Sequence, residues 1–73
     1  MIHAGQLIEN TLHKQGKTVT WFANQLCCTR TNVYKIFRKE NIDVYLLWRA
    51  SCILEYDLFQ EFSLKYSQFN NSK

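Results

Sequence analysis

Two short helical patterns, separated by only a few residues, constrain the fold of this chain more than any other feature. Apolar residues recur at spacings of three and four within 19–26 and again within 30–38, which places each set on one face of a helix. The connection has room only for a tight turn, so the two helices must cross steeply, and the small side chain of Ala23 lets them approach closely. The apolar positions are Val19, Phe22, Ala23 and Leu26 in the first pattern and Val33, Ile36 and Phe37 in the second.

The outer face of the second pattern has a different chemistry. It presents guanidinium, ammonium, amide and hydroxyl groups, and no carboxylate lies among them. Such groups suit base edges and phosphates in the major groove of DNA, which accommodates one α-helix. The residues on this face are Arg30, Thr31, Asn32, Tyr34, Lys35 and Arg38.

The segment resembles the helix-turn-helix of lambda-repressor-like (Xre/Cro-type) DNA-binding domains, and it is most similar to the short, single-domain bacterial members. The match rests on Ala23 as the small residue of the motif, on Thr29 as the cap before the recognition helix, and on a set of apolar positions. The resemblance covers most of the chain, because that family has one helix before the motif and two after it. It implies an all-α, compact five-helix domain that binds double-stranded DNA sequence-specifically as a small transcriptional regulator without a cofactor. The matching apolar positions are Phe22, Leu26, Cys28, Val33 and Ile36.

Three positions depart from the pattern of that family. Cys27 occupies the turn position that is commonly glycine, Phe37 a position that is often glutamate, and Lys39 the position where glycine often ends the recognition helix. Cysteine disfavours a positive φ, so the first departure bears on the geometry of the turn. None of the three removes the basic outer face.

The predicted interface uses both helices of the motif. Arg30 is placed to fork to guanine and Asn32 to adenine, because the N-terminal part of a recognition helix sits deepest in the groove. Hydroxyl and N–H groups at the start of the first motif helix are placed to bind a phosphate, with Lys17 adding charge. Tyr34 either contacts DNA or only covers its helix, and Trp21 either braces the motif against the DNA backbone or packs into the core. The predicted DNA-binding residues are Lys17, Thr18, Thr20, Thr29, Arg30, Thr31, Asn32, Tyr34, Lys35, Arg38 and Lys39.

The distribution of charge favours the same surface. The chain has 73 residues and a net charge of +3, and six Lys and Arg residues fall in 14–39, where there is no Asp or Glu. A basic centre in an otherwise slightly acidic chain is typical of one-sided binding to a polyanion. A solvated basic face is the simpler alternative. RNA is a weaker candidate than DNA, because the sequence has no RNA-binding motif and no aromatic stacking sheet.

The rest of the chain predicts three further helices. Only two glycines and no proline occur in the sequence, which favours compact helices over a turn-rich β-fold. We expect a single domain over 1–69 and a frayed tail over 70–73. The expected helices outside the motif span about 3–15, 44–54 and 58–66.

Helix ends are marked by residues with capping chemistry. Gly16 is placed to end the first helix in a left-handed turn. Thr18 and Asp43 have side-chain oxygens placed to accept hydrogen bonds from helix N–H groups. Asp57 and Gln60 have the spacing of a capping box at the start of the last helix.

Aromatic residues recur along one face of the last helix at steps of three and four. One interpretation is a homodimer interface, because two recognition helices about 34 Å apart can read a palindromic site. Another is a core face with a few exposed aromatics. If this face instead binds a different protein, the chain is an interaction or antitoxin-like module in which DNA binding is secondary. The predicted interface residues are Phe59, Phe62, Tyr66 and Phe69.

The sequence has no pattern for catalysis, metal binding or membrane insertion. Three cysteines are an odd number, and Cys27 and Cys28 are adjacent, so we expect reduced thiols in a cytoplasmic protein. The apolar runs are short and the N-terminus has no signal-peptide pattern, so we expect neither a membrane span nor a signal peptide. The cysteines and histidines lack metal-ligand or nucleophile–base spacing, which predicts no metal, no catalytic residue and no small-molecule substrate. A small enzyme or metal protein is therefore the weakest alternative.

Overall fold

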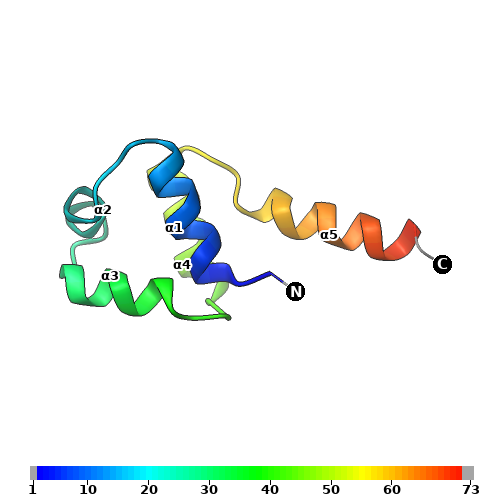
Figure 1. The fold of residues 1–73 in the computed structure, drawn as a ribbon, viewed down its shortest axis with the longest axis horizontal. Coiled ribbons are helices and arrows are strands. Elements are labelled where there is room, and N and C mark those ends of the chain that lie inside the picture. Colours follow the sequence, from blue (N-terminus) through cyan, green and yellow to red (C-terminus); the bar gives the residue numbers. More distant parts are fainter. Residues whose placement is uncertain (1, 72–73) are drawn as a thin grey trace.

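A computed structural model of the chain describes residues 2–71, except for the side chains of 65 and 67–71. This part of the chain forms five α-helices and no strand, which confirms the expected all-α, five-helix class. The first four helices pack around one core, and the fifth extends from it (Figure 1). The helices are α1 (Ala4–Lys14), α2 (Val19–Leu26), α3 (Arg30–Phe37), α4 (Val44–Leu54) and α5 (Phe59–Asn71).

The core is one apolar cluster to which the first four helices all contribute. Its largest fully buried side chains come from α1, α2, α3 and the link before α5. Burying one such side chain stabilises the fold by about 1.5–3 kcal/mol relative to leaving it exposed. This cluster therefore fixes the positions of α2 and α3 relative to α1 and α4. The largest fully buried residues are Ile8, Leu12, Phe22, Val33 and Leu58.

Three helices end in the same left-handed turn. Gly16 after α1, Cys27 after α2 and Glu55 after α4 have φ angles of 70°, 58° and 51°. At each end the N–H of this residue and the N–H of the next donate to carbonyls of the last helical turn, as in a Schellman motif. Gly16 confirms the predicted end of the first helix. Cysteine at position 27 does not prevent the left-handed conformation that glycine adopts most easily.

The N-termini of α2, α3 and α4 have the side-chain caps that the sequence predicts. Thr18, Thr29 and Asp43 each accept a hydrogen bond from the backbone N–H three residues later, at 3.0, 3.2 and 2.8 Å. These bonds satisfy N–H groups that have no partner within the helix. His3 caps α1 in the same way through Nδ1, a role that the sequence pattern did not indicate.

The start of α5 differs from the prediction. Helix α5 begins at Phe59 and continues to Asn71, well past its expected end. Asp57 accepts a hydrogen bond of 3.0 Å from the N–H of Phe59, but the Gln60 amide donates to the Tyr56 hydroxyl, also at 3.0 Å. The predicted capping box is therefore wrong, because the Tyr56 hydroxyl takes the side chain that would have completed it.

Helix α5 extends away from the four-helix core instead of packing along it (Figure 1). Its base is tied down by Leu58, which is fully buried and donates its N–H to Ser51 Oγ at 3.3 Å. The Tyr56 hydroxyl adds a 3.0 Å hydrogen bond to Glu61 Oε2. The molecule is therefore elongated, with principal extents of 44 × 20 × 19 Å.

Candidate nucleic-acid interface

Helices α2 and α3 form the unit that the two apolar patterns predict, with a short turn between them. Figure 1 shows α2 almost end-on and α3 lying across the view, so the helices cross steeply. Ala23 is 3% exposed, and its carbonyl accepts the N–H of Cys28 at 2.9 Å, which folds the turn directly onto α2. Val33 of α3 is fully buried in the same apolar cluster as Ala23. Ala23 and Val33 thus both face the core that the two helices share.

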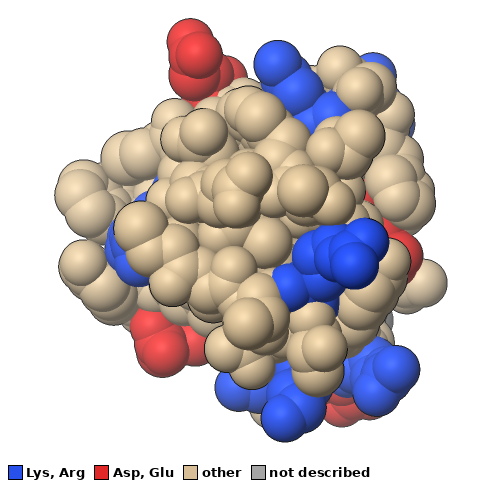
Figure 2. All heavy atoms as spheres, turned by 90° about the vertical axis from the view of Figure 1, so that its left-hand side faces the viewer, with Lys and Arg blue, Asp and Glu red and all other residues tan. Residues whose placement is uncertain are grey.

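All eleven predicted DNA-binding residues are exposed. Five of them are Lys or Arg, and none is acidic. The end of the molecule where α2 and α3 lie faces the viewer in Figure 2, which shows Lys and Arg over this face and Asp and Glu only near its edges. The link before α2, both helices and the end of α3 therefore present one largely neutral and basic surface. The residues are Lys17, Thr18, Thr20, Thr29, Arg30, Thr31, Asn32, Tyr34, Lys35, Arg38 and Lys39.

Helix α3 separates an apolar inner face from a polar outer face. Val33 and Phe37 are buried, whereas Arg30, Tyr34 and Lys35 are exposed. The Tyr34 ring packs edge-on against Phe37 at a centroid distance of 6.2 Å, and Tyr34 is still 48% exposed. Tyr34 thus both covers part of its helix and keeps half of its surface available to a ligand.

The end of α3 is held by the first turn of α1. The N–H of Ala4 donates to the Glu40 carbonyl at 3.0 Å, and the N–H of Gly5 donates to the Lys39 carbonyl at 2.9 Å. Gly5 is buried, and a Cβ added to it would lie 2.6 Å from the Phe37 carbonyl oxygen. The helical pattern of the sequence did not predict this positioning contact. Its signal was a glycine inside a helical pattern, which often marks close packing.

Lys17 lies over the ring of Trp21 at the start of α2. Its Nζ is 4.9 Å from the ring centroid, which is within the range of a cation–π interaction. Trp21 itself is half-buried and packs against the core. The structure therefore favours core packing for Trp21, and the same ring positions the cation of Lys17.

The aromatic face predicted on the last helix is only partly covered. Phe59 is half-buried and packs against the core, whereas Phe62 is 37% and Tyr66 67% exposed. The side chain of Phe69 lies outside the described residues. Two of the four predicted interface residues are thus accessible to a partner.

A second exposed apolar surface lies on the first half of α4. Val44, Tyr45 and Trp48 are 72%, 66% and 53% exposed. The rings of Tyr45 and Trp48 stack at a centroid distance of 6.0 Å. The sequence pattern predicted α4 but not this surface, because the apolar repeat that marks the helix lies on the opposite, buried face, at Leu47, Ala50 and Leu54.

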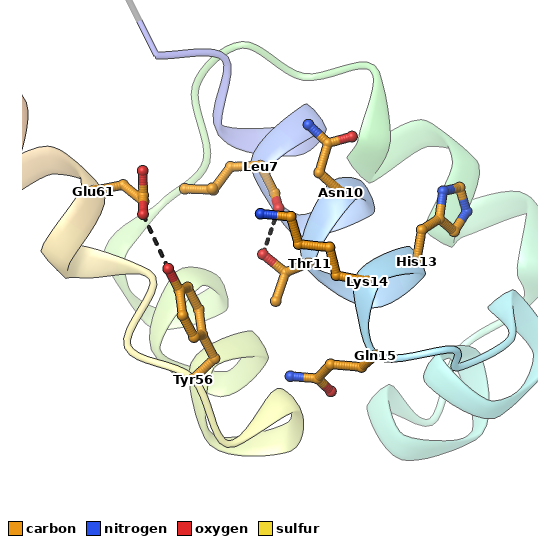
Figure 3. Close-up of a pocket in the computed structure, with 8 residues that line it drawn as sticks. All are labelled: Leu7, Asn10, Thr11, His13, Lys14, Gln15, Tyr56 and Glu61. Carbon is orange, nitrogen blue, oxygen red and sulfur yellow. Dashed lines mark hydrogen bonds between the residues drawn. The ribbon is translucent and has the colours of Figure 1, made fainter.

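A pocket of about 670 Å³ lies between α1, the end of α4 and the start of α5 (Figure 3). Glu61 lies at one side, where it accepts the hydrogen bond from Tyr56, and Lys14 points into the pocket. The lining contains charges of both signs among neutral groups, so it selects no particular ligand charge. The lining residues are Leu7, Asn10, Thr11, His13, Lys14, Gln15, Tyr56 and Glu61.

The described part of the chain contains neither a cluster of metal ligands nor a membrane-spanning helix. No three His, Cys, Asp or Glu side chains among these residues lie close enough to hold a metal ion. Cys27, Cys28 and Cys52 are all free thiols. None of the helices that residues 2–71 form has the length and apolar character required to cross a membrane.

Comparisons of the chain with protein-family models, with curated proteins and with solved structures find no match.

Proposed function

We propose that the protein binds double-stranded DNA through α2 and α3, with α3 in the major groove, as a small transcriptional regulator of the lambda-repressor-like type. One observation carries this proposal. Every exposed residue from Arg30 to Lys39 is a cation, an amide, a hydroxyl or a tyrosine, and none is a carboxylate. A helix with this outer face suits the base edges and phosphates of the major groove.

The support of α3 at both ends favours the same function. Thr29 caps its first turn, and the first turn of α1 bonds the carbonyls of the two residues Lys39 and Glu40 that follow it. A recognition helix needs such support, because base contacts require side chains held close to one geometry. The buried side chains of Val33 and Phe37 fix the rotation of α3 about its own axis.

The contacts divide into two kinds. Arg30 and Asn32, on the first turn, are proposed to read bases, and each bidentate contact is worth about 1–3 kcal/mol of discrimination. Lys17, Arg38 and Lys39 lie at the ends of the two helices and are proposed to bind phosphates. Phosphate contacts give affinity that falls steeply with salt, whereas base contacts give preference for one sequence.

The test is selection of bound sequences from a randomised duplex library, followed by binding measurements on the best sequence at several salt concentrations. We further propose that the regulator is a homodimer joined through the exposed aromatic face of α5, and we therefore expect a two-fold symmetric site. Asn32→Ala should weaken binding about 5- to 150-fold for each half-site and relax one position in each. Lys14→Met is the matched control, because it removes a cation that points into the pocket between α1 and α5 (Figure 3). Its site preference should equal that of the original protein.

Binding with a steep salt dependence but no enriched sequence would contradict the proposal. The basic face would then hold phosphates without reading bases.

A second candidate function is that of a protein-interaction or antitoxin-like module. The exposed aromatic side chains of α4 and α5 favour it, because apolar surface that a monomer leaves exposed often marks a protein contact. This alternative predicts a complex with a different protein and weak, sequence-independent binding to DNA.

A further inference from the structure

A smaller pocket lies where α2, α3 and α4 meet, beside the proposed recognition helix. Its volume is about 270 Å³. Sites for drug-sized ligands span roughly 300–1,000 Å³, so this pocket suits a smaller, single-ring molecule. We call it the basic pocket, and its lining residues are Leu26, Cys28, Asn32, Lys35, Ile36, Lys39, Leu46 and Arg49.

The floor of the basic pocket is apolar. Leu26 is buried, and Cys28, Ile36 and Leu46 are half-buried and pack against the core. A free cysteine in such surroundings behaves as a small apolar residue. The floor therefore favours a ligand with an apolar body that needs no hydrogen bonds there.

The rim of the basic pocket is cationic. Lys35 and Lys39 come from α3 and the residues directly after it, and Arg49 comes from α4. None of the described residues that line the pocket is Asp or Glu. Three positive charges around one space repel one another, so an anion bound between them relieves that repulsion. Arginine can bind a carboxylate through two parallel hydrogen bonds, and the two lysines of the rim add positive charge.

We propose that the basic pocket binds a small aromatic carboxylate, with its ring over the apolar floor and its carboxylate among Lys35, Lys39 and Arg49. Asn32, Lys35 and Lys39 also belong to the predicted DNA interface. A bound carboxylate therefore competes with DNA for these side chains and acts as an effector. This regulatory part rests on the proposed DNA binding, whereas occupancy of the pocket does not.

The first test is titration of the ¹⁵N-labelled full chain with 4-fluorobenzoate, followed by amide correlation spectra. Saturable shifts should occur at residues that line the basic pocket, with a dissociation constant of about 1 mM or below. The neutral analogue 4-fluorobenzamide should bind at least tenfold more weakly. Arg49→Met and, separately, Lys35→Met should weaken carboxylate binding at least fivefold, whereas Lys14→Met should leave it unchanged. Far-UV circular dichroism establishes that each variant is folded.

Two results would overturn the pocket assignment. One is the absence of saturable shifts around the pocket. The other is binding of 4-fluorobenzamide or of sulfate that is as tight as that of 4-fluorobenzoate. Tight binding of the neutral benzamide would show that the cations have no role, and tight binding of sulfate would show that the apolar floor has none.

The second test measures DNA binding with 4-fluorobenzoate present at constant ionic strength. Saturating carboxylate should weaken binding to the selected duplex about three- to tenfold, and Arg49→Met should abolish this effect. Carboxylate binding with unchanged DNA affinity would overturn the effector role alone. If the protein binds no DNA, the proposed function fails, and the titration still decides the pocket.

Discussion

The backbone N–H of Gly5 donates a 2.9 Å hydrogen bond to the carbonyl oxygen of Lys39, which joins the first turn of α1 to the end of α3. Helix N-termini have N–H groups without partners, and the residues after a helix often have unpaired carbonyls, so each end satisfies the other. The positive end of the α1 dipole also meets the negative end of the α3 dipole. The outer face of α3 thus depends on residues far from it in the sequence.

Replacement of Gly5 by alanine should lower the free energy of unfolding by about 3 kcal/mol. The added Cβ would lie 2.6 and 2.7 Å from the carbonyl oxygens of Phe37 and Lys39, and backbone atoms cannot move aside as a side chain can. Urea unfolding would measure the change. Gly16→Ala is the matched control, because Gly16 has a positive φ but no atom within 4 Å of an added Cβ. It should cost only about 1 kcal/mol. Equal losses for the two variants would contradict close packing at Gly5.

Replacement of Cys27 by glycine should raise the free energy of unfolding by about 0.5–1 kcal/mol. Cys27 is exposed and has a φ of 58°, where a residue with a Cβ is strained and glycine is not. The gain is smaller than the full strain because glycine also increases the entropy of the unfolded chain. Cys27→Ser keeps the Cβ and should leave stability unchanged in the same thermal or urea experiment. A serine variant as stable as the glycine variant would show that the thiol, and not the backbone, is responsible.

Removal of the cap of α3 by Thr29→Ala should cost about 1 kcal/mol of stability. The Thr29 hydroxyl accepts the N–H of Asn32 at 3.2 Å, and alanine leaves that N–H without a side-chain acceptor. Thr29→Ser restores the acceptor and should recover most of the loss in urea unfolding. If serine is no better than alanine, the methyl group of threonine matters and the cap does not.

The exposed aromatic face of α5 should hold the proposed homodimer together. Phe62→Glu and Tyr66→Glu should each weaken self-association at least tenfold in sedimentation equilibrium, because a charge would be buried between the two copies. Trp48→Glu tests the other exposed apolar surface, on α4, and should leave association unchanged. If Trp48→Glu weakened association and the two α5 variants did not, the dimer interface would lie on α4.

Most of the fold follows from local sequence signals. The apolar spacings predicted the first four helices to within a residue or two. The capping residues predicted four of the helix ends, and these residues are Gly16, Thr18, Thr29 and Asp43. These signals are local, because a helix face or a cap involves residues three or four positions apart. The Asp57–Gln60 pair failed because Tyr56, just outside the expected motif, offered the Gln60 amide another partner.

The exposed residues of the candidate site could be predicted from the sequence, whereas the contacts that hold α3 in place could not. The exposure of the five interface residues in α3 follows from the same helical spacing that buries Val33 and Phe37. The contact of Gly5 with Lys39 and the position of Arg49 beside α3 depend on how α1 and α4 pack against α3. Periodicity within one helix contains no information on such contacts between helices.

Because α5 extends away from the core, a small change in its angle at the base moves its far end by a large distance. Its 13 residues correspond to a length of about 20 Å at 1.5 Å per residue. A tilt of about 10° at its base therefore displaces its far end by about 3.4 Å, which is the rise of one base pair along a DNA strand. In a dimer joined through α5, the hydrogen bonds of Tyr56 with Gln60 and Glu61 would fix the angle between α5 and the core. That angle would then determine how far apart along the DNA the two recognition helices lie.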